Sequence, residues 1–287
     1  MSLRVALCKG INRLFPLPVH PFNLNNQGIM TYSRWQYEKG GDTIKFFLEF
    51  ADEKQIFDGK TVVDIGCGAA GKTMYYAGLG VKKIYGIEVL EKYRREAEEL
   101  AAELGAADKF EFICADGAQM PFENNSIDTI IMNDAMEHVD EPQAVLTECL
   151  RVLAPGGRVY INFPPYYHPY GAHLSDVLAM PWVHLLFSDK TLIRAYKQLA
   201  ENLPDGEARI AFRISKDEHD NDYFSYINKM KVKRFRKMLK DMNLTPIYYH
   251  EAPLRGFLTP LAKIPAVKEL FVKMVVCIIE KEKELGL

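Results

Sequence analysis

The chain has 287 residues, of which 48% are hydrophobic, a formal net charge of −2 and an isoelectric point near 6.4. It can bury a large core, and its charge gives no reason to expect a nucleic-acid partner. Its five cysteines are scattered and odd in number, and no apolar run reaches the ~18–20 residues of a membrane helix. We therefore expect a cytoplasmic protein with no transmembrane segment.

Loop-like sequence fills the first forty residues, where three prolines lie between positions 16 and 21. Apolar residues at helical spacing then predict a helix from Thr43 to about Ala51. From there to Phe163 the pattern alternates between strand and helix. The predicted strands are 61–65, 83–88, 110–114, 129–134 and one that ends at Phe163, with a helix over 141–153 before the last of them.

The alternation stops after Pro164-Pro165. About sixty-five residues intervene before a basic helix over 234–241, a sixth strand over 245–249 and a last strand over 273–279. We interpret the chain as one domain over 1–287. Its expected parts are an N-terminal cap and helix (1–58), a cofactor-binding core (59–164), a lid insertion (165–230) and the C-terminal part of the core (231–287).

Two incompatible motifs overlap in the loop after the first predicted strand. Read from Asp64, the segment is Asp-x-Gly-x-Gly after a β-branched run, the nucleotide loop of S-adenosylmethionine (SAM) methyltransferases. Read from Gly66, it is Gly-x-x-x-x-Gly followed by Lys72 and Thr73, the P-loop of ATPases and GTPases. Both loops lie between a buried strand and a helix, so local context does not choose between them.

Carboxylates at the ends of three predicted strands favour the first interpretation. Asp64 and Glu88 lie in the first and second strands, and Asp116 follows the third. In a parallel sheet these ends meet at the ligand-binding edge. They would repel ATP, a polyanion, because two unit charges ~4 Å apart interact by about 4 kcal/mol at an effective dielectric near 20. SAM carries a sulfonium, an ammonium and one carboxylate, so its net positive charge suits these acids.

With these residues the chain resembles the class I SAM-dependent methyltransferases, in particular the small-molecule group with Glu-His-Val after the fourth strand, here 137–139. Matching blocks run from Thr61 to Phe163 in the expected order. The resemblance implies an α/β, Rossmann-like fold. Its seven-stranded, mostly parallel sheet has the order 3-2-1-4-5-7-6 with an antiparallel last strand, helices on both faces and a lid insertion after strand five.

The same resemblance implies a cofactor, SAM, and the residues that bind it. Glu88 would accept the ribose hydroxyls, Asp116 would bond the adenine amino group, and Asn133 would line the floor of the pocket. The chain departs from the family pattern at 69–73, which leaves the role of Lys72 open. The full set of expected cofactor-binding residues is Asp64, Gly66, Cys67, Gly68, Glu88, Asp116, Gly117 and Asn133.

Methyl transfer from a sulfonium is an in-line displacement, and a base is required only when the acceptor is a poor nucleophile. His138, after the fourth strand, is one candidate, because histidine titrates near neutral pH. Tyr166 and His168, at the start of the insertion, are the others. Each also has an ordinary structural interpretation. No zinc-type Cys/His spacing is present, so we expect no metal, with metal-dependent O-methylation as an alternative.

The function we predict is SAM-dependent O- or C-methylation of a small-molecule or saccharide-type acceptor. A P-loop nucleotide hydrolase and a non-catalytic SAM-binding regulator are the alternatives. The basic, amphipathic stretch 229–240 and the apolar N-terminal segment also leave open a peripheral membrane contact or a lipid-linked acceptor. An ordinary surface helix with one buried face explains 229–240 equally simply.

Overall fold

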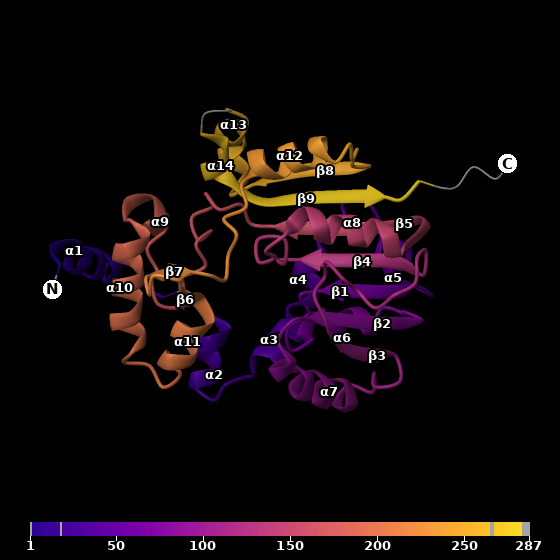
Figure 1. The fold of residues 1–287 in the computed structure, drawn as a ribbon, viewed down its shortest axis with the longest axis horizontal. Helices are drawn as coiled ribbons and strands as arrows, with labels where there is room; N and C mark the ends of the chain where they lie inside the picture. The colour runs from indigo at the N-terminus through magenta and orange to yellow at the C-terminus, as the bar shows by residue number, and fades with distance from the viewer. Residues whose placement is uncertain (1, 18, 265–266, 283–287) are drawn as a thin grey trace. The chain divides into compact units, whose positions relative to one another are not determined.

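The computed structural model describes residues 2–17, 19–264 and 267–282 (Figure 1). The chain divides into two compact units, each assembled from segments far apart in sequence. Of the described residues, the sheet unit comprises 31–163, 232–252 and 274–282, and the helical unit comprises 2–17, 19–30, 164–231, 253–264 and 267–273. Within the described residues, no helix combines the length and apolar character that crossing a bilayer requires.

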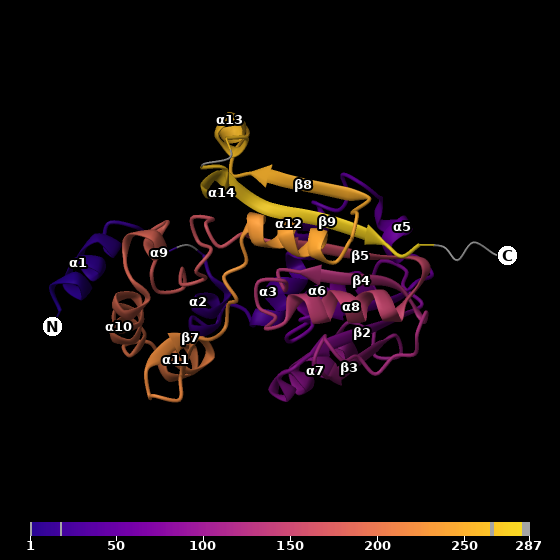
Figure 2. The same cartoon turned by 45° about the horizontal axis from the view of Figure 1, so that its top comes forward.

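A seven-stranded sheet forms the centre of the sheet unit, with the order β3-β2-β1-β4-β5-β9-β8. Strands β1 to β5 run parallel, and β9 pairs antiparallel with β5 (Figures 1 and 2). This confirms the predicted fold class and strand order. The strands are β1 (Thr61–Ile65), β2 (Lys83–Glu88), β3 (Phe110–Cys114), β4 (Ile127–Asn133), β5 (Leu153–Phe163), β8 (Tyr248–Pro253) and β9 (Val272–Glu280).

Helices cover both faces of this sheet. Tyr160 of β5 packs on Phe47 on one face, with ring centroids 5.5 Å apart. Phe163, three residues along the strand, therefore points to the opposite face, where it packs on Phe235 at 4.9 Å. The helical elements of the unit are α3 (Tyr32–Glu38), α4 (Gly40–Ile44), α5 (Glu53–Phe57), α6 (Gly71–Ala77), η1 (Glu91–Tyr93), α7 (Arg94–Glu103), α8 (Pro142–Val152) and α12 (Val232–Asp241).

The N-terminal forty residues are not loop, contrary to the prediction. They contain α1 (Leu3–Asn12) and α2 (Pro21–Asn26) as well as α3. Pro21 was interpreted as a loop residue, yet it occupies the first turn of α2, where a missing N–H costs nothing. Pro21 thus begins a helix that the prediction had assigned to a loop.

Two predicted element boundaries are also wrong. The helix expected over 43–51 is α4 followed by turns, although the apolar residues that suggested it, such as Ile44 and Phe47, are fully buried. The sixth strand, β8, begins three residues later than expected. Because β8 is an edge strand that remains mostly half-buried, its polar residues His250 and Glu251 concealed it from a hydrophobicity pattern.

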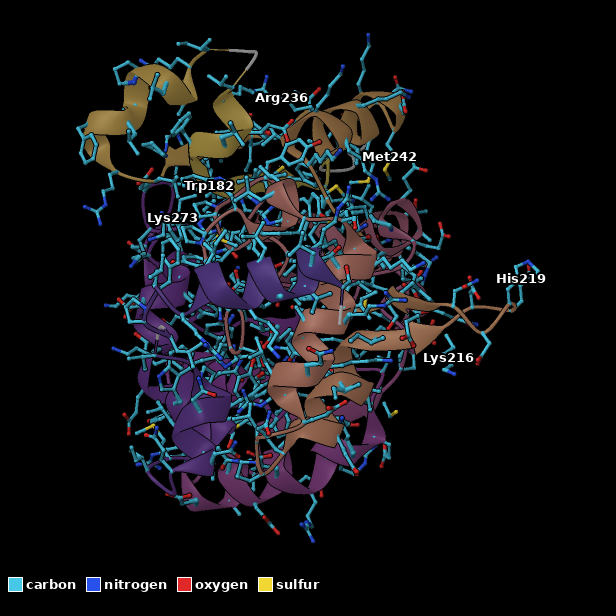
Figure 3. All side chains as sticks on the ribbon, turned by 90° about the vertical axis from the view of Figure 1, so that its left-hand side faces the viewer. Trp182, Lys216, His219, Arg236, Met242 and Lys273 are labelled. Carbon is cyan, nitrogen blue, oxygen red and sulfur yellow. The ribbon has the colours of Figure 1, made fainter. Side chains whose placement is uncertain are left out.

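The helical unit contains α9 (Val183–Leu186), α10 (Asp189–Ala200), α11 (Gly206–Arg213), η2 (Gly256–Leu258), α13 (Thr259–Ala262) and α14 (Lys268–Phe271), besides α1 and α2. A hairpin of β6 (Ile214–Lys216) and β7 (Asp222–Phe224) projects from it, with His219 at the tip (Figure 3). Its apolar core joins Val5 and Cys8 of α1 to Leu192 and Tyr196 of α10. The 165–230 segment thus shares a core with the N-terminal helix, and its role as a lid stays a prediction.

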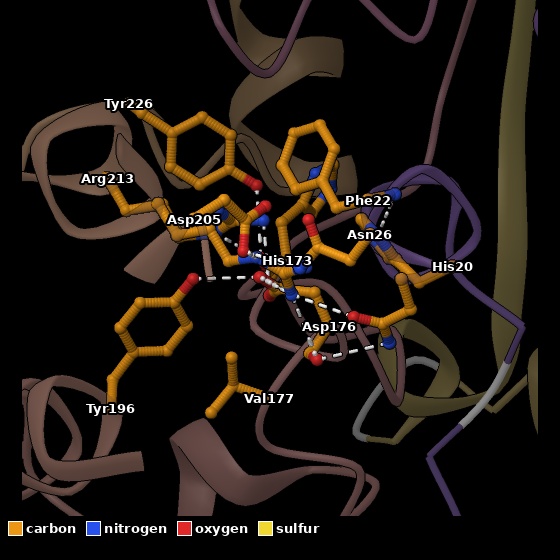
Figure 4. Close-up of polar contacts among 12 residues, drawn as sticks. His20, Phe22, Asn26, His173, Asp176, Val177, Tyr196, Asp205, Arg213 and Tyr226 are labelled. Atoms are coloured by element: carbon orange, nitrogen blue, oxygen red, sulfur yellow. Dashed lines mark hydrogen bonds and ion pairs between the residues drawn. The ribbon is translucent and has the colours of Figure 1, made fainter. Parts of the chain in front are cut away.

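A buried ionic cluster lies inside the helical unit (Figure 4). The fully buried carboxylate of Asp176 lies 3.3 Å from Arg209 Nη1 and 3.1 Å from Arg213 Nη2, and it accepts a hydrogen bond from Tyr196 at 2.8 Å. Arg209 also donates to Asn23 of α2 at 2.9 Å. The cluster therefore ties α2, α10 and α11 to the loop that carries Asp176. Sequence analysis did not identify it.

Candidate functional site

The glycine loop between β1 and α6 is held by backbone hydrogen bonds to β2. Gly66 and Gly68 have φ of +75° and +53°, the left-handed region that glycine adopts without strain. Gly66 N and Cys67 N both donate to Ile87 O, at 2.8 and 3.2 Å. Gly68 N donates to Glu88 Oε2 at 3.0 Å. The loop and the end of β2 thus form one rigid edge that carries the carboxylate of Glu88.

Asp64, at the end of β1, is buried beneath this loop. Its Oδ2 accepts a hydrogen bond from Thr73 Oγ1 at 2.6 Å. Burial raises the pKa of Asp64 to about 6, although Thr73 and the nearby Lys72 ammonium act in the opposite direction. The threonine that a P-loop would direct to magnesium therefore serves the aspartate of the methyltransferase motif.

Lys72 binds to polar groups at the end of β4. Its Nζ lies 2.8 Å from Asp134 Oδ2 and donates to Asn133 O and Oδ1 at 3.4 and 3.5 Å. Burial alone would lower the pKa of Lys72, but the Asp134 carboxylate outweighs it and the pKa is raised. The lysine thus stays charged and paired with a carboxylate, where a P-loop lysine would meet phosphates.

Asn133 forms the buried floor beneath this ion pair. Its Nδ2 donates to the hydroxyl of Tyr76 at 3.0 Å. That hydroxyl lies 3.4 Å from Thr43 Oγ1, which links the end of β4 to α6 and α4. The amide is therefore fixed in orientation, and its place in the floor of a cofactor pocket stays a prediction.

The strand ends bring the predicted cofactor residues to one edge of the sheet. Glu88 ends β2 beside β1 and β3, with Ile65 opposite Ile87 and Glu88 opposite Cys114. Asp116 is exposed just beyond β3, and its Oδ1 accepts from Ala118 N at 2.8 Å. Gly117 is buried, and a Cβ there would lie 3.1 Å from Ile65 Cγ2. This acidic edge fits a cationic nucleoside ligand such as SAM, whose binding by these residues stays a prediction.

His138 follows β4 beside a buried carboxylic acid. Its Nε2 lies 3.8 Å from Glu137 Oε1, and about a third of its side chain is exposed. Burial and the neighbouring Asp134 raise the pKa of Glu137 well above its ordinary value. His138 is thus accessible to a substrate, whereas Glu137 is buried beneath it.

The other two catalytic candidates, Tyr166 and His168, belong to the helical unit. The ring of Tyr166 packs on that of His184 at 4.8 Å, and burial raises the pKa of Tyr166 to about 12. At neutral pH its hydroxyl is a hydrogen-bond donor and not a ready base. His168 Nδ1 accepts from Tyr170 N at 3.2 Å, which fixes the tautomer that donates from Nε2. Their contact with an acceptor stays a prediction.

Sequence analysis identified the carboxylates but missed their partners. Lys72 and Thr73 were interpreted through the P-loop match, and no role was predicted for Asp134 at the end of the strand over 129–134. The signal that could have found the Lys72–Asp134 pair is the order of strands. In the predicted sheet β1 and β4 are neighbours, so the helix after β1 begins next to the end of β4.

Comparison with known proteins decides between the two motifs. Residues 63–161 match the family described as "Methyltransferase domain". Residues 63–161 therefore form a class I SAM-dependent methyltransferase domain. SAM is the methyl donor of this family. The predicted recognition is thereby confirmed, and the P-loop interpretation of Lys72 and Thr73 is set aside.

Relatives of this methyltransferase domain act on small molecules according to their names. Tocopherol O-methyltransferase of Arabidopsis thaliana is 34% identical over 115 residues, which cover 40% of this chain and 33% of that protein. Sterol 24-C-methyltransferase of Pneumocystis carinii is 31% identical over 138 residues, 42% of this chain and 37% of that protein. The chain covers between 28% and 44% of the curated relatives it matches.

Solved structures extend the similarity of the fold beyond the matched domain. The structure of a putative sarcosine dimethylglycine methyltransferase from Galdieria sulphuraria covers 91% of this chain, with a TM-score of 0.55. This chain covers 97% of that structure at 17% sequence identity. At this identity the likeness establishes the methyltransferase fold and nothing further.

Proposed function

We propose that the protein transfers the methyl group of SAM to an oxygen or carbon atom of a small-molecule acceptor. The observation that carries the proposal is the family match over 63–161, whose glycine loop and strand-end carboxylates form one acidic edge. Relatives named for tocopherol and sterol methylation support an apolar acceptor over a saccharide. The acidic edge and the formal charge of −2 favour this acceptor over nucleic acid.

Bound SAM supplies an electrophilic methyl group on a sulfonium, which is already a good leaving group. The protein's task is to hold the acceptor in line with that methyl group and to exclude water. In this proposal Asp64 and Glu88 hold the cofactor through its cationic and ribose groups. His138 accepts the proton that an acceptor hydroxyl loses as the new O–C bond forms. An acceptor whose attacking atom already carries a negative charge needs no such base.

The experiment must distinguish this enzyme from the alternative, a non-catalytic SAM-binding regulator. The direct experiment incubates the purified chain with SAM and a panel of phenols, quinols and sterols, and follows S-adenosylhomocysteine by mass spectrometry. The proposal predicts S-adenosylhomocysteine and a methylated product in equal amounts with at least one acceptor. Tight SAM binding without turnover on any acceptor of these classes would favour the regulator.

His138→Gln separates a base from a structural residue in the same assay. If His138 accepts the proton, kcat falls by roughly 10²–10⁴-fold while the Kd for SAM is unchanged. The matched control is His250→Gln, on the edge strand β8. Loss of SAM binding together with kcat would assign His138 to the cofactor pocket.

A reducing, cytoplasmic location belongs to the proposal too, and the free thiols of all five cysteines support it.

A further inference from the structure

Exposed apolar side chains are unevenly distributed over the chain. Among the described residues, the sheet unit exposes only Leu48, Val89, Leu90 and Ile247 as large apolar side chains. All the others belong to the helical unit, although it is the smaller of the two. Single exposed leucines need no explanation, but such a concentration on one unit does.

Helix α1 carries apolar residues on two faces. One face, with Val5 and Cys8, is buried in the core that α1 shares with α10. The other exposes Leu3 (84%) and Leu7 (54%), which lie four residues apart and thus on one stripe. The second stripe is thus largely exposed to solvent.

The same pattern continues along the chain and on α9. After α1, large fractions of Leu14 (78%), Leu17 (52%) and Val19 (76%) are exposed. On α9, Leu185 (41%) and Leu186 (65%) are exposed, four and three residues before α10 begins at Asp189. We use the name α1–α9 surface for these leucines and five basic residues. Its members are Leu3, Leu7, Leu14, Leu17, Leu185, Leu186, Arg4, Lys9, Arg13, Lys190 and Arg194.

Basic residues lie near these leucines in the sequence, and the acid that follows Leu186, Asp189, is paired with Lys229 at 2.6 Å. The segment from 2 to 19 contains Arg4, Lys9 and Arg13 and no acidic residue. Arg4 also lines a pocket of about 220 Å³ with Lys190 and Arg194, which brings the start of α1 against the start of α10. None of these five cations forms an ion pair within the described residues. Lys9 instead donates to the neutral side chain of Gln198 at 3.1 Å.

An anionic lipid bilayer fits both properties of this surface. Leucines that reach the boundary between headgroups and acyl chains leave water, while lysines and arginines contact lipid phosphates. A second copy of the chain fits less well, because a two-fold contact would place the five cations against their own copies. Nucleic acid would satisfy the cations but leave the leucines in water.

We propose that the α1–α9 surface docks the helical unit on an anionic membrane. The apolar face of α12, the other basic helix, cannot serve in this way, because Val232, Phe235, Met238 and Leu239 are buried in the sheet unit. Docking places the protein where an apolar acceptor would be dissolved. It requires neither SAM nor an acceptor, so its failure and the failure of the proposed methyl transfer are separate results.

The test is flotation of the purified full chain with phosphatidylcholine vesicles, with and without phosphatidylglycerol. We expect binding only to the anionic vesicles, and release at high salt because screening weakens the phosphate contacts. Leu3→Gln with Leu7→Gln should weaken binding about tenfold or more. Arg4→Gln with Arg13→Gln and Arg194→Gln should do the same. The apolar control is Leu48→Gln with Ile247→Gln, and the charge control is Arg95→Gln with Lys237→Gln, all in the sheet unit and exposed.

Thermal unfolding and SAM affinity of each variant show that the fold is intact, since none of these residues belongs to the candidate cofactor site. Equal loss of vesicle binding in the control variants would overturn the proposal, as would equal binding to neutral vesicles or none to anionic ones. So would a dimer, detected by light scattering without lipid, that the Leu3 and Leu7 substitutions abolish. That result would make a second copy the occupant.

Discussion

The Lys72 ammonium lies 2.8 Å from the Asp134 carboxylate and joins the start of α6 to the end of β4. Because 15% of the lysine side chain and 37% of the aspartate side chain are exposed, the pair lies at the boundary between the core and the acidic edge. Lys72 thus neutralises the charge of Asp134, whereas the carboxylates of Asp64 and Glu88 stay available to interact with a cationic cofactor.

Lys72→Met removes this charge and keeps the length of the side chain. We expect the free energy of unfolding in urea to fall by about 1–3 kcal/mol, because Asp134 loses its partner but keeps some contact with water. Lys109→Met, at an exposed position of the same unit, is the control and should be nearly neutral. Equal stability of the two variants would show that the pair contributes nothing.

Glu88→Ala should weaken SAM binding by roughly 1.5–3 kcal/mol, because it removes hydrogen bonds to a charged acceptor. Calorimetric titration measures this directly. Glu99→Ala, at an exposed position on α7, is the matched control. Glu88 also accepts from Gly68 N and Leu90 N, both at 3.0 Å, so the unfolding free energy must be measured as well. An unchanged SAM affinity would show that Glu88 does not bind the cofactor.

The buried Asp64 gives a prediction for pH. Its pKa of about 6 in the folded chain exceeds its ordinary 3.8, so the folded state holds the proton more tightly than the unfolded state does. Its ionisation therefore lowers stability as pH rises from about 4 to 6, by a total on the order of 3 kcal/mol. Asp64→Asn keeps an acceptor for Thr73 and removes this dependence.

Urea unfolding near pH 4 and near pH 7, in the absence of cofactor, tests this linkage. The Asn variant should gain stability relative to the natural chain as the pH rises between these values. A difference between the two proteins that stays constant with pH would contradict the raised pKa of Asp64.

Gly71→Ala tests the packing of α3 on the start of α6. A Cβ at Gly71 would lie 2.1 Å from Ser33 O, so the backbone must shift, at a cost of about 1–3 kcal/mol of unfolding free energy. Gly10→Ala in α1 is the control, because nothing lies within 4 Å of its Cβ. That substitution should stabilise its helix by about 0.5–1 kcal/mol. Equal effects at the two glycines would refute the close approach at Gly71.

Asp176→Asn should destabilise the helical unit by about 3–5 kcal/mol, because two buried guanidinium groups lose their shared counter-charge. Asp222→Asn breaks the more exposed pair with Lys197 and should cost about 0–1 kcal/mol. Limited proteolysis, which reports local opening, distinguishes the two variants. Similar digestion rates would mean that the buried cluster does not stabilise this unit.

The sheet was predictable because its strands are buried and β-branched. The bounds of β1, β2 and β3 agree residue by residue with the prediction, since each has buried apolar residues between turn signals. The edge strand β8 and the short helices near the N-terminus were missed or displaced. Their residues are only partly buried, so their apolar pattern is weak.

The candidate site was predictable only in part, for a related reason. Motif spacing places carboxylates at strand ends, which the sheet order brings together. Partners such as Lys72 for Asp134, or Arg209 for Asp176, depend on contacts between elements far apart in sequence. No local pattern encodes such contacts, and only the tertiary structure reveals them.

Side-by-side calorimetric titration with SAM, S-adenosylhomocysteine and Mg-ATP tests the central claim most directly. Micromolar binding of SAM or its product, with no heat from Mg-ATP, is the result that the acidic edge predicts. Binding of Mg-ATP alone, abolished by Lys72→Ala, would contradict the account and make Lys72 and Thr73 part of a phosphate-binding loop.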